Sequence, residues 1–175
     1  MAVYVVDQSH STVGFTVRHA GIGKTRGHFN VFEGTIDVPQ ADTWEGASAK
    51  GTIDATSVDT KNVDRDNHLR SADFFDVEQF PEWTFESTAV KGGREQFTLE
   101  GNLTIHGVTQ PVSLDVSFEG EATDPFGAER IAFEATTTIS RKSYGLTWNA
   151  ALEAGGVLVG DKVAITLEIE AVKQA

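Results

Sequence analysis

The 175-residue chain contains no cysteine, has few cationic side chains and lacks any long apolar run. Without cysteine it can form neither a disulfide framework nor a thiolate metal site. Fourteen lysines and arginines against 26 aspartates and glutamates leave a formal charge of −12, which argues against sequence-independent binding to nucleic acid or to anionic lipid surfaces. Residues 1–7 have one brief apolar stretch and no basic residue, unlike a signal peptide or a membrane span. We therefore expect a cytoplasmic protein without stable membrane insertion.

Motifs that bring catalytic or metal-binding groups together are also absent. His10, His19 and His28 are nine residues apart, which is not a metal-ligand spacing within one strand or helix, and no His-Glu-x-x-His motif occurs. No Gly-x-Ser-x-Gly motif marks a hydrolase nucleophile. The glycine-rich residues 20–27 lack the spacing of a phosphate-binding loop and are typical of a hairpin turn. We therefore assign no catalytic residue, no metal and no cofactor.

Alternation of apolar and polar residues runs through most of the chain and predicts β-strands. Val13, Phe15 and Val17, for example, share one face of an expected strand, opposite Thr12 and Thr16. The predicted strands are residues 11–19, 28–38, 47–55, 82–89, 97–105, 112–118, 131–139 and 163–170. The predicted turns and irregular segments are residues 20–27, 39–46, 91–94, 107–111, 120–128 and 143–160, followed by a frayed end at 172–175.

This pattern predicts an all-β protein that forms one domain over residues 1–175. Each strand has one polar face, which indicates an antiparallel sheet. A sandwich and a barrel both fit about eight such strands. Their length of about nine to eleven residues favours a single extended barrel, because long tilted strands close around an axis and leave no exposed edge. A homodimer, which the sequence leaves open, would then need a surface patch.

One segment, residues 57–81, interrupts the strands. A short inserted helix is predicted over about residues 62–72, because Asn62 is a suitable N-cap and acidic residues follow it in the first turn. Asp66 and Arg70 are four residues apart and are expected to pair on one helix face. The helix has too few apolar residues for a broad hydrophobic stripe. We therefore expect the aromatic residues that follow to anchor it as a plug at the mouth of the β-structure.

The inward face of such a barrel combines small and large residues. Gly34, Ala47, Ala49, Gly51 and Gly101 fall on the apolar face beside several phenylalanines. This mixture is compatible with a packed core, in which small and large side chains interdigitate, and with an open apolar pore about 25 Å long. The predicted pore residues are Val13, Phe15, Val17, Phe32, Ile36, Ile53, Phe74, Trp83, Phe85, Leu103, Ile105, Leu114, Val116 and Phe133.

Several motifs, taken together, resemble the YceI-like family of polyisoprenoid-binding proteins. They are DQSHSTVGFTVRH (7–19), SVDT (57–60), RDNHLRSADFFD (65–76), FP (80–81), FES (85–87), GNLTIHGVT (101–109) and VGDKV (159–163). The resemblance covers nearly the whole chain. It implies an extended lipocalin-like barrel whose apolar pore holds a long-chain polyisoprenoid or similar amphiphilic lipid, such as a quinone or the tail of a prenyl diphosphate. It also implies a protein of transport, storage or sequestration, not an enzyme.

Polar residues on the predicted helix are candidates for contact with a lipid headgroup. Arg65, His68 and Arg70 could orient the polar end of a ligand, or could belong to an ordinary solvated helix face. Lys24 and Arg26 could meet an anionic headgroup if their turn lies at the mouth of the pore. Two other functions stay open: an enzyme acting on an apolar substrate, with His68 and Asp66 as acid–base partners, and a packed barrel that serves as a scaffold for a protein partner.

Overall fold

A computed structural model describes residues 1–152 and 156–175, which contain eleven strands, one α-helix and three short 3-10 helices. The strands are β1 (Ala2–Val6), β2 (Thr12–His19), β3 (Gly23–Phe29), β4 (Phe32–Val38), β5 (Ser48–Asp54), β6 (Val58–Asp59), β7 (Glu82–Gly92), β8 (Gln96–Ile105), β9 (Val108–Thr123), β10 (Glu129–Ser140) and β11 (Val159–Lys173). The helix α1 is Val63–Arg70, and the 3-10 helices are Gln8–His10, Ala55–Ser57 and Arg141–Tyr144. In these described residues, no helix is long and apolar enough to cross a membrane.

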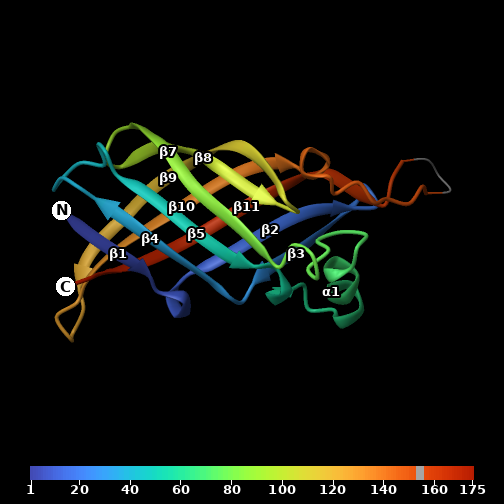
Figure 1. The fold of residues 1–175 in the computed structure, drawn as a ribbon, viewed down its shortest axis with the longest axis horizontal. Helices are drawn as coiled ribbons and strands as arrows, with labels where there is room; N and C mark the ends of the chain where they lie inside the picture. Colours follow the sequence, from blue (N-terminus) through green and yellow to red (C-terminus); the bar gives the residue numbers. More distant parts are fainter. Residues whose placement is uncertain (153–155) are drawn as a thin grey trace.

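Eight antiparallel strands close the barrel. Each strand in the order β1-β4-β5-β7-β8-β9-β10-β11 is hydrogen-bonded to the next, and β11 returns to β1 through pairs such as Val5–Val172. Figure 1 shows long strands tilted around an elongated axis, with both chain ends at one end of the barrel and α1 at the other. The predicted all-β barrel of about eight strands with one inserted helix is confirmed.

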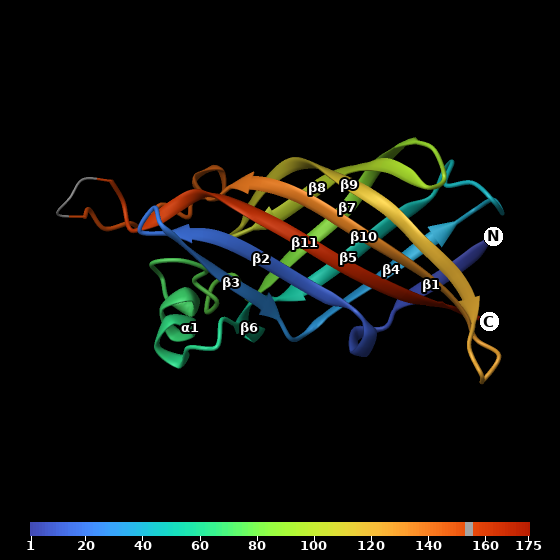
Figure 2. The same ribbon diagram turned by 180° about the vertical axis from the view of Figure 1, so that it is seen from behind.

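Three further strands, β2, β3 and β6, extend the sheet towards α1. The last residues of β11 pair with β1, and most of the rest of β11 pairs with β2. β1 and β2 therefore follow one another along the same edge of β11. β3 pairs with β2 and, through His28 and Phe29 alone, with β6. In the described chain, no strand pairs with the other edge of β3 at residues 23–27. The chain that follows β6, including α1, lies beside this part of the sheet (Figure 2).

The predicted strand 28–38 is wrong, because the chain forms two strands there with a bend at Asn30 and Val31. At the bend, the Asn30 and Val31 amides donate to the carbonyl and the hydroxyl of Ser57, and the chain changes its strand partners. The predicted turn 20–27 is too long, since β3 already begins at Gly23. Gly27 therefore belongs to β3 and not to a turn, and glycine is needed there because a Cβ would come 2.4 Å from the ring of Phe15.

Other predicted boundaries fall short for a common reason: strand pairing continues past the apolar pattern. β9 reaches Thr123 and β10 begins at Glu129, so the predicted loop 120–128 shortens to a turn. The predicted frayed end is wrong as well, because Val172 is paired on both sides, with Arg130 and with Val5.

The predicted irregular segment 143–160 includes 153–155, which lie outside the described residues. In its described part, Ala151 and Val157 form an isolated antiparallel bridge.

Helix α1 lies where the sequence predicts it. The Asn62 side chain accepts a hydrogen bond from the Arg65 amide and so caps the first turn. The expected pairing of Asp66 with Arg70 is wrong. The buried Asp66 carboxylate accepts hydrogen bonds from the amide and hydroxyl of Thr60, while Arg70 donates to the Thr56 and Val58 carbonyls. Both side chains therefore attach α1 to the preceding segment, because Thr60 offers donors to the Asp66 carboxylate and backbone carbonyls offer acceptors to Arg70.

Arg130 joins three parts of the chain on the outside of the barrel. Its Nη1 donates to Asp7 Oδ2 and to Glu170 Oε2, both at 2.8 Å, and its Nε donates to Asp124 Oδ2 at 2.9 Å. The Arg130 guanidinium is the main reason why the pKa values of Asp7 and Asp124 lie below their usual range. The cluster ties the bend after β1, the β9–β10 turn and β11 together.

Replacing Arg130 with glutamine should make the protein less stable at neutral pH and less sensitive to acid. A carboxylate with a lowered folded-state pKa stabilises the fold above its unfolded pKa and loses this contribution as the pH falls through the folded value. The stability difference between wild type and Arg130→Gln should therefore shrink below about pH 4. Denaturant midpoints at pH 7 and pH 3 would show this.

Lys173→Gln, which removes a more exposed pair with Glu129, is the matched control and should have a small effect. A difference that does not change with pH would contradict the prediction.

Candidate functional site: an apolar cavity inside the barrel

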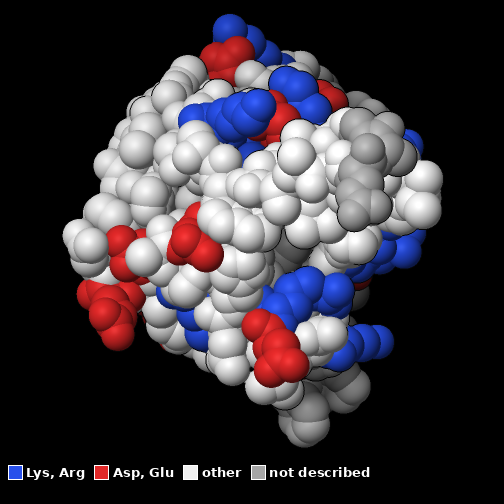
Figure 3. Space-filling model, turned by 90° about the vertical axis from the view of Figure 1, so that its right-hand side faces the viewer, with Lys and Arg blue, Asp and Glu red and all other residues white. Residues whose placement is uncertain are grey.

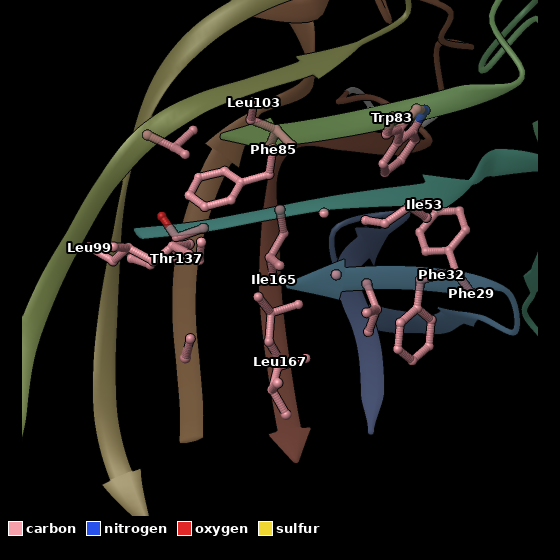
Figure 4. Close-up of a pocket in the computed structure, with 18 of the residues that line it drawn as sticks. Phe29, Phe32, Ile53, Trp83, Phe85, Leu99, Leu103, Thr137, Ile165 and Leu167 are labelled. Atoms are coloured by element: carbon pink, nitrogen blue, oxygen red, sulfur yellow. The ribbon is translucent and has the colours of Figure 1, made fainter. Parts of the chain in front are cut away.

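The barrel encloses a cavity of ≈ 290 Å³ that is not sealed from solvent. This volume is close to the lower end of ordinary ligand pockets, which span about 300–1,000 Å³. The surface of its wall is almost entirely apolar. Figure 4 shows side chains from several strands pointing into the same space, including Phe85, Leu103, Ile165 and Leu167. A wall with so little charged or hydrogen-bonding surface suits a hydrocarbon chain and offers little to a polar guest.

All fourteen residues predicted to line a pore lie on this wall, and so do Gly34, Ala47, Ala49 and Gly51. Alternation along each strand therefore identified the inward face correctly. Among the expected small residues, Gly101 is the exception: a Cβ there would come 2.4 Å from the Phe85 ring, which occupies the space that the glycine leaves. Contact of these wall residues with a ligand stays a prediction.

Sequence reasoning missed part of the wall. β11 contributes Val163, Ile165, Leu167 and Ile169, and the same alternation could have added them to the predicted set. Thr137 was also missed because it interrupts an apolar face; it lies on the wall between Ala135 and Ile139 (Figure 4). The remaining additions include Phe29, Trp44, Leu69, Phe75 and Leu146, most of which lie outside the predicted inward faces.

Trp44 closes the barrel at the end that carries the termini. Its ring packs edge-on against Phe118 and Phe133, with centroids 5.1 and 5.2 Å away. Its indole N–H donates to the Arg94 carbonyl at 2.8 Å, and the Arg94 guanidinium carbon lies 5.0 Å from the Trp44 ring centroid. These contacts hold a loop residue in the core, so this end of the barrel is firmly capped.

The opposite end is covered by the segment that contains α1. Phe74 and Phe75 are buried, and the Phe75 ring lies edge-on to Trp83 with centroids 4.9 Å apart. Within α1, only Asp66 is buried, so polar contacts hold the helix more than apolar packing does. The predicted plug anchored by following aromatic residues is consistent with this arrangement.

Arg141 is the one buried cation among the described residues, with 4% of its surface exposed. Its guanidinium donates to four backbone carbonyls: Gly160 at 2.8 Å, Leu146 at 2.6 Å, Trp148 at 2.9 Å and Val159 at 3.2 Å. Burial lowers the pKa of Arg141, and the nearby charge of Asp161 opposes this shift. Arg141 thus holds the chain after β10 against the start of β11, beside the cavity wall.

The predicted headgroup residues lie on α1 and do not form part of the cavity wall. Arg65 donates to the hydroxyl and carbonyl of Thr60, which leaves it attached to the neighbouring segment. His68 Nε2 lies 2.9 Å from Asp73 Oδ2, and its ring packs edge-on against Trp148. The expected pairing of His68 with Asp66 is therefore wrong, because Asp66 is engaged by Thr60.

Three potential metal ligands, Asp7, His10 and Glu170, lie close together on the barrel surface. The spacing of the histidines did not indicate this group, since Glu170 is far from Asp7 and His10 in the chain. Arg130 pairs with both carboxylates and offsets part of their negative charge. An ion pair accounts for the arrangement, so the group supplies no argument for a metal.

Comparison with known proteins gives a consistent result. A family model described as the YceI-like domain matches residues 4–171. The Protein YceI of Salmonella arizonae is 40% identical over 152 residues, which cover 83% of this chain and 77% of that protein. Among solved structures, a Campylobacter jejuni YCEI protein has a TM-score of 0.76 at 29% identity, with 90% of each chain covered. A polyisoprenoid binding domain from Saccharophagus degradans has a TM-score of 0.74 at 16% identity, with 98% of each chain covered, and shares the fold.

Proposed function

This chain belongs to the YceI-like family, and on that premise we propose that its barrel binds the apolar chain of a long polyisoprenoid or similar amphiphilic lipid, for transport, storage or sequestration. A quinone or a prenyl diphosphate has the required long tail. The observation that carries the proposal is the apolar cavity, whose wall includes residues from both core clusters of the barrel. The Saccharophagus degradans neighbour, named a polyisoprenoid binding domain, supports the same ligand class.

The energetics of burial agree with a hydrocarbon ligand. Each methylene group transferred from water into an apolar site is worth about 0.8 kcal/mol, so affinity grows with the length of chain enclosed. The cavity of ≈ 290 Å³ is small for a long isoprenoid. The cavity would therefore enclose only part of the ligand chain, with the rest extending towards the mouth, or the wall would expand around the ligand.

We place the mouth at the α1 end. The end with the termini is capped by Trp44, whereas the α1 end is covered by a connecting segment that is held by side-chain hydrogen bonds and by the buried Phe74 and Phe75. A connecting segment of this kind opens at a lower free-energy cost than the hydrogen-bonded strands of a closed barrel. Arg65, His68 and Arg70 lie near this mouth, and their contact with a headgroup is part of the proposal.

The proposal is tested by extracting purified protein with organic solvent and analysing the extract by mass spectrometry, together with titration of delipidated protein with a fluorescent prenyl probe. A bound lipid with a long isoprenoid or acyl chain, or saturable uptake at one probe per chain, is expected. An extract without lipid and no uptake of the probe would contradict the proposal. Cell fractionation and sedimentation would test the predicted cytoplasmic location and the homodimer.

A further inference from the structure

The cations of this acidic protein are distributed unevenly between its two ends. At the end that carries the termini, they form ion pairs: Lys91 with Glu100, Arg94 with Glu121, Lys173 with Glu129, and Arg130 with three carboxylates. On the β2–β3 hairpin, which points towards the α1 end, Arg18, Lys24 and Arg26 are exposed. Within the described chain, none of these three forms an ion pair. With respect to the described residues, the hairpin therefore presents unpaired positive charge.

No carboxylate within the hairpin balances this charge. Residues 8–32 contain no aspartate or glutamate, although the chain has 26 of them. Arg18 lies directly opposite Lys24 in the β2–β3 ladder, and Arg26 lies two residues further along β3. Since Val13, Phe15 and Val17 point into the cavity, alternation places all three cations on the outer face. Like charges directly opposite each other destabilise a sheet, so an anionic partner would relieve a repulsion that the free protein retains.

An exposed aliphatic side chain lies at the tip of the same hairpin. Ile22 is 92% exposed, and on the neighbouring segment Val157 is 50% exposed. The two regions are joined by a hydrogen bond from the Ala20 amide to the Leu158 carbonyl at 2.7 Å. Figure 1 shows the hairpin tip at the end away from both termini, and Figure 3, which views this end, shows groups of lysine and arginine beside uncharged surface. Aliphatic groups bordered by free cations are the combination that binds at the surface of an anionic bilayer.

We propose that the tip of the β2–β3 hairpin, with Ile22 at its apex and Arg18, Lys24 and Arg26 behind it, docks the barrel on an anionic lipid bilayer. This inference rests on the proposed function, because docking at this end brings the mouth of the cavity to the surface from which a lipid ligand is taken. The net charge of −12 repels the rest of the molecule from such a surface. It thereby keeps docking reversible and limits it to one orientation.

Vesicle flotation with the full chain tests the proposal. Wild-type protein should bind vesicles of phosphatidylcholine mixed with phosphatidylglycerol, should bind poorly to phosphatidylcholine alone, and should dissociate at high salt. The triple variant Arg18→Gln/Lys24→Gln/Arg26→Gln should bind about 100-fold more weakly, because each cation near an anionic surface is worth about 1 kcal/mol. Ile22→Asp should also reduce binding, since it removes the apolar apex and adds a negative charge.

The matched control is Lys50→Gln/Lys91→Gln/Lys173→Gln, which removes three exposed cations elsewhere and reaches the same net charge. It should bind as wild type does. Equal losses in both triple variants would reduce the effect to net charge and overturn the proposal, as would failure of wild type to bind anionic vesicles.

Uptake of the prenyl probe in vesicle-free solution separates the docking proposal from the proposed function. The hairpin variants should take up the probe normally; if wild type takes it up but ignores vesicles, docking alone is wrong, and if wild type takes up no probe, the proposed function is wrong.

Discussion

Replacing Ala49 with tryptophan should weaken lipid binding by about 100-fold while the barrel stays folded. Ala49 lies on the inward face of β5, paired with Ile36 on the cavity wall. An indole at this position would fill the space that a ligand chain needs. Exclusion of three to four methylene groups at about 0.8 kcal/mol each amounts to about 3 kcal/mol, which is about 100-fold in affinity. Titration with a fluorescent prenyl probe measures the effect.

The control for this prediction is a tryptophan on the outer face. Thr84 is exposed on β7 and lies outside the cavity wall, so Thr84→Trp should bind the probe as wild type does. Thermal denaturation of both variants should show that the folded barrel persists, because the cavity accommodates part of the added volume that would otherwise cause overpacking. Unchanged affinity in a folded Ala49→Trp protein would show that the ligand does not enter the cavity.

Replacing Arg141 with alanine should cause the largest loss of stability, about 3–5 kcal/mol. The guanidinium is buried and serves four backbone carbonyls. Removal of the side chain leaves these buried or partly buried acceptors without their donors. A loss of this size is a large part of the free energy of unfolding of a typical domain. Denaturant unfolding with linear extrapolation measures it.

Two further variants separate hydrogen bonding from charge. Arg141→Lys keeps the positive charge but has three donors on a single nitrogen, so it should recover only part of the lost stability. Lys142→Ala removes the adjacent, exposed cation and should change the free energy of unfolding by less than about 0.5 kcal/mol. If Arg141→Ala were no more destabilising than Lys142→Ala, the four hydrogen bonds would not be important to the fold.

Features that depend only on residues close together in the sequence were predicted well. Asn62 caps α1 because a side-chain oxygen three residues before the Arg65 amide is a short-range arrangement that needs no tertiary partner. Alternation placed Val13, Phe85 and Leu103 on the wall because the period of a strand depends only on its backbone. Predictions that required a partner elsewhere in the chain failed. Asp66 and His68 were paired by proximity on one helix, but Thr60 and Asp73 are their partners.

Trp44 shows why part of the site could not be predicted. It lies in a loop between β4 and β5, where no periodicity marks an inward position. Its burial depends on the distant residues Phe97, Phe118 and Phe133, which meet at this end only after the barrel has closed. Arg141 is similar, because its four acceptors come from two chain segments that the barrel brings together.

By itself the sequence determined that the chain forms amphipathic antiparallel strands, where the helix lies, and which face of most strands points inward. These properties follow from backbone geometry and short-range hydrogen bonds. Only the tertiary structure decided that the inward side chains leave a cavity, since an internal void depends on how side chains from opposite walls meet. It also decided that cations without an ion pair among the described residues lie together on the β2–β3 hairpin at the α1 end, because ion pairing is set by which carboxylates the closed barrel brings within reach.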